Sequence, residues 1–191
     1  MDQVMRGRDF WRWVGWLRHL GALLGMLGMM AQQHQRPAPK AVSDYEVKAA
    51  FLLNFTKFVT WPEGAFEDSG SPLAICILGP DPFGPVMDQL AEGEEAGGRK
   101  VIVRRIERTP RAKACQVLYV GVPEKEVAGV LSDLGPGVLT VGQHAGFLNE
   151  GGIINFVIEE RHVRFDINRS AAASAGLTIS ARLLSVARAT R

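Results

Sequence analysis

Cysteine and histidine are scarce in this 191-residue chain, which has two cysteines and four histidines. Two cysteines are too few for a disulfide-dense miniprotein or for a zinc module rich in cysteine. The histidines beyond residue 31 are His34, His144 and His162, and no two of them have the spacing of metal ligands. We therefore expect neither a metal site nor another cofactor.

Catalytic sequence motifs are also missing. The chain has no P-loop and no Gly-x-Ser-x-Gly elbow, and its Gly-Pro-Gly segment at 135–137 precedes a predicted strand rather than a helix. Cys76 lies in an apolar run that offers no nearby base to activate it as a nucleophile. No group of residues stands out as catalytic, so we expect a protein that is not an enzyme.

The net charge is small, because 22 lysines and arginines face 20 aspartates and glutamates. A dedicated nucleic-acid binder is usually strongly basic, so we expect no nucleic-acid partner. The charges are nevertheless segregated: residues 63–95 hold eight acidic residues and no basic one, whereas 99–113 hold seven basic residues and one acid. Such blocks are typical of solvated faces, or of a polarised surface that steers a protein partner or holds an anion.

Residues 1–31 have the composition of a secretory signal peptide. Arginines precede an uncharged apolar run at 20–31, which is shorter than the roughly 20 residues that span a bilayer. The alternative is an uncleaved membrane anchor that also includes residues 11–17. Residues 32–42 are polar and contain two prolines, which is typical of a flexible tether. We place the folded domain at 43–190 and expect it to be exported.

Export makes a disulfide between Cys76 and Cys115 one of two interpretations. An oxidising compartment favours the pairing of two cysteines in one domain. Both residues lie in apolar segments that predict buried strands, so they can equally be two separate core residues. Nothing local fixes their Cα atoms at the separation of about 5–6 Å that a bridge needs.

Apolar periodicity predicts an α/β fold. Ser43 and Glu46 form a capping box that starts a first helix, and Trp61-Pro62 is expected to end it. Further helices are expected at 85–91, at 123–134 and at 168–188, the last with a break near Gly176. Strands are expected at 73–78, 100–106, 116–120 and 138–141. Segments 153–158 and 163–167 predict a hairpin with a four-residue turn. We expect a single domain with a mostly parallel central sheet flanked by helices, and one antiparallel hairpin near the C-terminal end.

Helical spacing marks an apolar stripe along the first helix, formed by Val47, Ala50, Phe51, Asn54, Phe55 and Phe58. We expect this stripe to face the core, with Asn54 as a buried amide bonded to nearby backbone. Lys48 and Lys57 fall off the stripe.

Polar residues follow or end the predicted strands, where ligands bind in open α/β sheets. Asp81 follows the first strand, Arg104 and Arg105 lie near the end of the second, and His144 follows the fourth. We expect these residues as candidates for binding a small ligand or an anion. On this interpretation the protein is an exported small-molecule binding module that feeds a sensor kinase.

Four segments in order resemble the YfiR family. They begin at residues 45 (YEVKAAFLLNF, then WP at 61), 77 (ILGPDPFG), 151 (GGIINFV, then VRFDIN at 163) and 175 (AGLTIS, then LL at 183), so the resemblance covers about 42–189. It implies a small periplasmic α/β protein without catalysis. The best-known member represses an inner-membrane diguanylate cyclase through its periplasmic part, which lowers cyclic di-GMP and biofilm formation.

The resemblance also implies partners and contact residues. The expected partner is a membrane-bound diguanylate cyclase or another sensor protein, with an outer-membrane lipoprotein that sequesters the regulator and a homodimer as further expectations. Candidate contacts are Asn155, Arg164 and Phe165 in the hairpin, and Leu177 and Ile179 beyond it. Relatives with a second cysteine pair near the hairpin have no counterpart here, since 150–158 contains no cysteine.

Overall fold

The computed structural model describes residues 43–191, without the side chains of residues 110, 111 and 113. The predicted signal peptide at 1–31 and tether at 32–42 lie outside the described residues. Within the described part, no helix is both long enough and apolar enough to cross a membrane.

The first described helix, α2 (Asp44–Phe55), begins where the capping box predicts. Ser43 Oγ accepts a hydrogen bond from Glu46 N at 3.2 Å, and Glu46 Oε2 accepts one from Ser43 N at 2.7 Å. The helix ends at Phe55, so the prediction that it reaches Trp61-Pro62 was wrong. The chain leaves the helix because Val59–Thr60 forms strand β1, which pairs with β9 (Thr178–Ile179) far along the sequence.

The buried side of α2 also differs from the predicted stripe. Asn54 is exposed. The helix is apolar around most of its circumference, so spacing alone does not identify the inward side. Lys48 is buried, and its ammonium lies 3.0 Å from Gln143 Oε1 and 4.5 Å from the centre of the Tyr45 ring. The buried residues of α2 are Lys48, Ala49, Leu52, Leu53 and Phe55.

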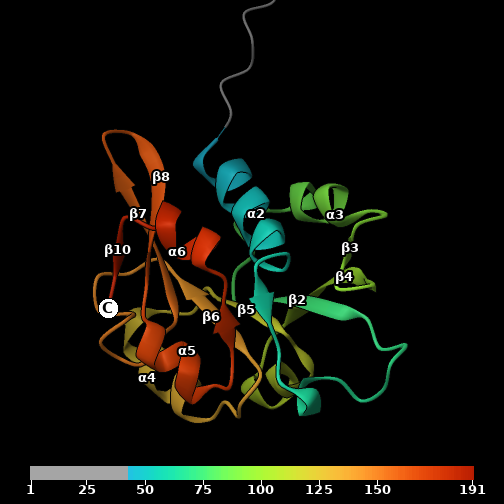
Figure 1. Cartoon of the computed structure of the whole chain (residues 1–191). Helices are drawn as coiled ribbons and strands as arrows, with labels where there is room; N and C mark the ends of the chain where they lie inside the picture. Colours follow the sequence, from blue (N-terminus) through green and yellow to red (C-terminus); the bar gives the residue numbers. More distant parts are fainter. Residues whose placement is uncertain (1–42) are drawn as a thin grey trace, which may run out of the picture. The chain divides into compact units, whose positions relative to one another are not determined.

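An eight-stranded sheet forms the centre of the domain, with strands in the order β10-β8-β7-β6-β5-β2-β4-β3 (Figure 1). Its strands are β2 (Leu73–Leu78), β3 (Glu95–Ala96), β4 (Arg99–Ile106), β5 (Val117–Val120), β6 (Leu139–Gly142), β7 (Ile154–Glu159), β8 (His162–Ile167) and β10 (Ala189–Thr190). The adjacent strands β4, β2, β5, β6 and β7 pair in parallel, in this spatial order, and β7 and β8 form an antiparallel hairpin. The predicted fold class is confirmed.

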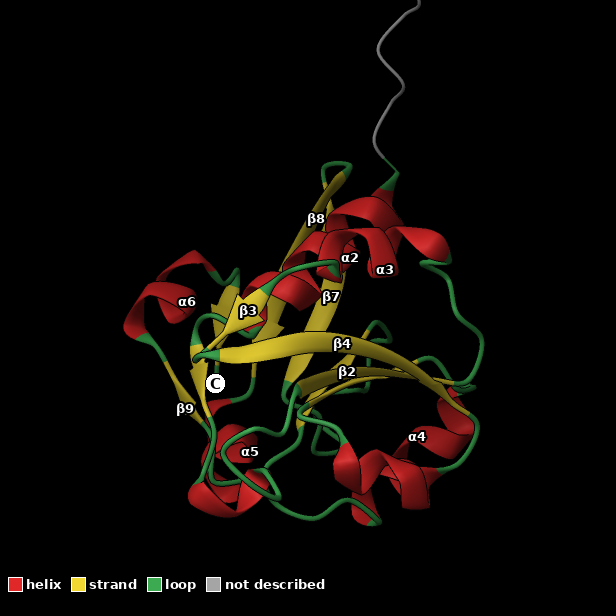
Figure 2. Ribbon diagram, turned by 90° about the vertical axis from the view of Figure 1, so that its right-hand side faces the viewer, coloured by secondary structure: helices red, strands yellow, loops and turns green. Residues whose placement is uncertain are grey.

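Helices cover both faces of this sheet (Figure 2). Helices α2 and α3 (Pro85–Ala91) pack on one face, and α4 (Glu124–Ser132) packs on the other together with the 3₁₀ segment Thr109–Ala114. Strand β2 separates the two cores, because alternate side chains of a strand point to opposite faces. Its residues Leu73, Ile75 and Ile77 belong to the first core, and Ala74, Cys76 and Leu78 belong to the second.

The region after Asn168 is more broken than predicted. Asn168 Oδ1 caps α5 (Arg169–Ser174) by accepting a hydrogen bond from Ala171 N at 2.9 Å. The chain then turns at Gly176, whose φ is +73°, and continues through β9 into α6 (Ala181–Val186) and β10. Strand β10 was not predicted, because it depends on pairing with β8.

Cys76 and Cys115 are joined by a disulfide, with their Cα atoms 5.8 Å apart. Of the two interpretations left open by the sequence, the bridge is therefore the one found. Both residues are also buried, on the sheet face that α4 covers. The bridge ties the middle of β2 to the segment that leads into β5.

Removing the bridge tests its contribution to stability. For Cys76→Ala/Cys115→Ala we expect the free energy of unfolding to fall by about 4 kcal/mol, because the bridge joins residues 39 apart and restricts the unfolded chain. Urea denaturation followed by circular dichroism measures the change. The double variant should not respond to reductant. An unfolding midpoint shared by the variant and the oxidised protein would contradict the prediction.

Candidate functional site

The carboxyl ends of β2 and β5 form the switch point of the sheet. After β2 the chain adds β4 on one side of that strand, and it then adds β5 on the other side. A crevice between two such strand ends is the usual ligand site of an open α/β sheet. Here the two turns pack against each other. A Cβ atom on Gly79 would lie 3.2 Å from the Gly121 carbonyl, and one on Gly121 would lie 2.9 Å from Pro80 O. The crevice is therefore closed by these two turns, and the polar side chains at this edge of the sheet lie around it.

Asp81 and Arg105, both predicted as ligand-binding candidates, bind each other. Arg105 Nε donates to Asp81 Oδ2 at 2.9 Å, and its Nη1 and Nη2 atoms donate to the two Asp88 carboxylate oxygens on α3 at 2.7 and 2.6 Å. Asp81 Oδ1 also accepts hydrogen bonds from the backbone of Phe83 and Gly84. The hydrogen bonds from Arg105 hold the pKa of Asp88 below its ordinary value. This arrangement braces β4 against α3.

Arg104 lies on the opposite face of β4 from Arg105. It is in register with Cys76 and is exposed beside a groove of about 720 Å³. Gln116 shapes the groove wall, because its Nε2 donates to Ala65 O at 2.6 Å and its Oε1 accepts from Ala74 N at 2.8 Å. Among the predicted anion-binding residues, Arg104 is the one that lines a groove without an ion pair among the described residues.

The loop that follows β6, residues 142–152, folds around the ring of Phe147, which is fully buried. Gly142 and Gly152 pack against this ring so closely that a Cβ atom on either would overlap it. The backbone closes the loop through a hydrogen bond from Gly152 N to Phe147 O at 2.9 Å. His144 lies edge-on to the same ring, with 5.5 Å between ring centres. The glycines of this loop therefore fix where its polar side chains lie.

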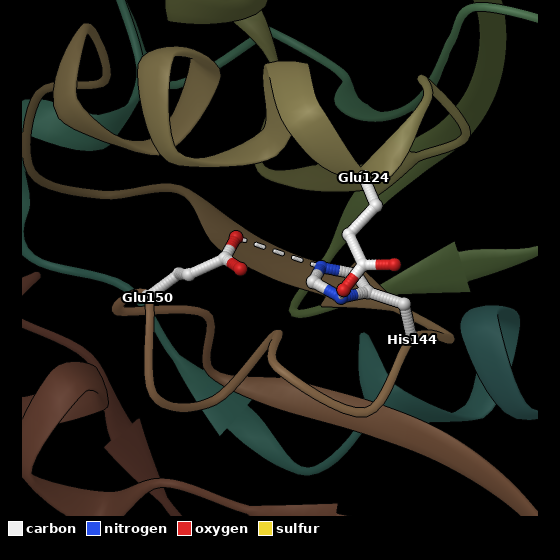
Figure 3. A group of neighbouring side chains, drawn as sticks. All are labelled: Glu124, His144 and Glu150. Atoms are coloured by element: carbon white, nitrogen blue, oxygen red, sulfur yellow. Dashed lines mark ion pairs between the residues drawn. The ribbon is translucent and has the colours of Figure 1, made fainter.

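Glu124, His144 and Glu150 come together at this edge of the domain (Figure 3). His144 Nδ1 lies 3.5 Å from Glu124 Oε1, and His144 Nε2 lies 3.6 Å from Glu150 Oε2. Both ring nitrogens and Glu150 Oε2 are buried without a hydrogen-bond partner among the described residues. Sequence analysis identified His144 and missed the two glutamates, because they come from the start of α4 and from the far end of the loop.

Hairpin β7–β8 extends past its neighbours in the sheet (Figure 1). Strand β6 pairs with Ile154 and Asn155 of β7, and β10 pairs with Asp166 and Ile167 of β8, whereas the hairpin itself continues to the pair Glu159–His162. Within the described chain, residues 157–164 therefore have no strand along either outer edge. The turn is Glu160 and Arg161, both with positive φ, rather than the four residues predicted.

The predicted partner-contact residues lie at different depths. Arg164 is exposed on β8, and Ile179 is half-buried in β9. Asn155, Phe165 and Leu177 are buried, so their side chains offer no surface for direct contact. Phe165 instead packs edge-on against Phe55 of α2, with 5.1 Å between ring centres, and this contact holds the base of the hairpin.

A family model described as YfiR/HmsC-like matches residues 45–188. The chain belongs to this family. It is a regulatory, non-catalytic family of periplasmic proteins, and the disulfide fits an oxidising compartment.

One solved structure shares the fold at low sequence identity, and a second matches below the level that indicates a common fold. A conserved domain protein from Vibrio cholerae O1 biovar eltor has a TM-score of 0.51 and 13% identity, over 78% of this chain and 60% of that chain. The ABC domain in complex with L-Trp from Streptococcus pneumoniae has a TM-score of 0.42 and 13% identity, over 62% of this chain and 55% of that chain. The present chain thus spans about 60% of the length of the Vibrio protein. No curated protein sequence matches it.

The ion pair of Arg105 predicts a pH-dependent contribution to stability. Because the pKa of Asp88 is lowered in the folded protein, the pair stabilises the native state above the ordinary aspartate pKa and loses this effect as the pH falls through the lowered value. For Arg105→Gln we expect a loss of about 0.5–1 kcal/mol at pH 7, since the pair is exposed. The loss should shrink at pH 2. Urea denaturation at both pH values measures it.

Arg104→Gln is the matched control, because Arg104 lies next to Arg105 on the same strand and has no ion pair among the described residues. It should leave stability unchanged at both pH values. A loss for Arg105→Gln that is equal at pH 7 and pH 2 would contradict the role given to the Asp88 pair.

Proposed function

We propose that this protein is an exported, non-catalytic regulator that binds the periplasmic part of an inner-membrane signalling protein and holds it inactive. Membership of the YfiR/HmsC-like family favours a diguanylate cyclase as this partner. Repression would then lower cyclic di-GMP and biofilm formation, and an outer-membrane lipoprotein would release the cyclase by sequestering the regulator. The observation that carries the binding role is the projecting hairpin with two open edges.

An open strand edge is a natural docking surface, because its unpaired backbone N–H and C=O groups can pair with a strand of another chain. Residues 157–164 provide such an edge on each side of the hairpin. Ile158 adds an apolar anchor, since its side chain is 51% exposed, and Arg164, which pairs with Val157, adds a positive charge on the other face of the hairpin. The core contacts of Phe156 and Phe165 with α2 hold the base of the hairpin in place.

Substitution of Ile158 tests this surface. We expect Ile158→Asp to weaken co-purification with the periplasmic region of the partner at least tenfold, because an apolar anchor is replaced by a charge. In a strain that lacks the gene, the variant should fail to restore the low cyclic di-GMP level that the unchanged protein restores. Circular dichroism should show an unchanged fold, since Ile158 is exposed.

Val186→Asp is the matched control, because Val186 is a similarly exposed apolar residue, at 57%, outside the hairpin. It should bind and repress like the unchanged protein. Deletion of the gene with no change in cyclic di-GMP across growth conditions would overturn the cyclase as partner. Normal binding by Ile158→Asp would overturn the hairpin as the docking surface.

A second candidate function is the binding of a small molecule that is sensed by a membrane kinase. The observation that favours it is the groove beside Arg104, whose volume of about 720 Å³ lies in the range of small-molecule sites. A panel of anions and amino acids tested by thermal shift should then contain a compound that raises the melting temperature. Arg104→Gln should abolish that shift, and a panel without any shift would reject this function.

A further inference from the structure

We propose that Glu124, His144 and Glu150 form a binding site for a divalent transition-metal ion, with Zn²⁺ as the ion that suits these donors best. One imidazole and two carboxylates are common zinc ligands, and they leave room for a water molecule or a partner side chain in the fourth position. The proposal is independent of the hairpin surface.

The distances within the cluster fit a shared cation better than hydrogen bonds. His144 Nδ1 lies 3.5 Å from Glu124 Oε1, and the other ring nitrogen, Nε2, lies 3.6 Å from Glu150 Oε2, whereas N–H···O hydrogen bonds are about 2.7–3.2 Å long. Two ligands bound to a tetrahedral zinc ion at 2.0–2.1 Å lie roughly 3.3–3.4 Å apart. An ion between His144 Nε2 and Glu150 Oε2 would need only a small inward movement of these two side chains. Glu124 faces the other ring nitrogen, so its side chain must turn around the imidazole to become the third ligand.

The buried atoms that face one another are also suited to a shared cation. A neutral imidazole exposes one nitrogen lone pair, and Glu150 presents a carboxylate oxygen. These buried atoms have no hydrogen-bond partner among the described residues, and a buried polar group without a partner destabilises the folded protein. A metal ion between His144 Nε2 and Glu150 Oε2 would satisfy both atoms. Glu124 is 70% exposed at the start of α4, so its side chain can turn toward the ion.

The loop provides a cradle for these ligands. Phe147, packed between Gly142 and Gly152, fixes the loop from which His144 and Glu150 project. Gly146 leaves space between the two ligands, because a Cβ atom there would lie 2.9 Å from Glu150 Oε1 and 3.4 Å from His144 Cε1. Metal sites depend on such prior positioning of their ligands.

Calorimetric titration of the untagged, chelator-treated protein with Zn²⁺ tests the site. We expect one ion per chain, and a loss of affinity of about tenfold or more for His144→Ala and for Glu150→Gln. Glu124→Gln should have a smaller effect, because this residue is the most exposed of the three. Cobalt substitution should give the visible absorption bands of a four- or five-coordinate ion. A protein that binds neither Zn²⁺ nor Co²⁺ stoichiometrically would overturn the proposal.

The chain offers controls for each ligand. His162→Ala and Glu126→Gln replace exposed residues of the same types outside the cluster and should bind zinc unchanged. Gly146→Ala keeps all three ligands but should weaken binding, because its methyl group displaces Glu150. Circular dichroism without metal checks that each variant is folded. Unchanged Zn²⁺ binding by His144→Ala, or an affinity for Mg²⁺ equal to that for Zn²⁺, would overturn the assignment of a zinc site. A variant that binds Zn²⁺ normally but no longer represses would instead concern the proposed docking surface on the hairpin.

Discussion

Strand β2 is bonded along both edges and buried on both faces, and the rest of the domain is arranged around it. It pairs with β4 on one side and with β5 on the other, so without it the sheet would divide into two unconnected parts. Its alternating side chains belong to two separate cores. Every side chain of such a strand must be apolar and compact, because no face is left for a polar group to reach water. The brace of Arg105, the groove beside Arg104 and the loop after β6 all take their positions from this strand and its neighbours.

Local sequence signals predicted those elements whose formation depends on nearby residues. The apolar run of β2 and the capping box at Ser43 each indicate the local structure from a few neighbouring residues. The signals failed where distant pairing decides the outcome. Helix α2 stops early because β1 pairs with β9, and its buried side includes Lys48 because Gln143, from the loop after β6, lies beside it in the fold.

The same distinction applies to the candidate sites. Asp81 and His144 could be selected from the sequence because polar residues after strands gather at one edge of a parallel sheet. Their surroundings could not be predicted, since Asp88 and Glu124 come from other elements, Glu150 comes from the far end of the loop, and each alone resembles a solvated carboxylate. Phe165 lies in a segment that defines the family resemblance, yet it is buried against Phe55. A residue that identifies a family can therefore serve the core, while the exposed Ile158 beside it provides surface.

The disulfide between Cys76 and Cys115 has a kinetic consequence that follows from its depth. Thiol–disulfide exchange requires a thiolate to reach one of the two sulfur atoms, and both residues are almost completely inaccessible. A reductant must therefore wait for the second core to open, which is a rare event for a central strand. The bridge therefore reflects the redox conditions in which the chain folded, and it does not respond to brief redox changes around the folded protein.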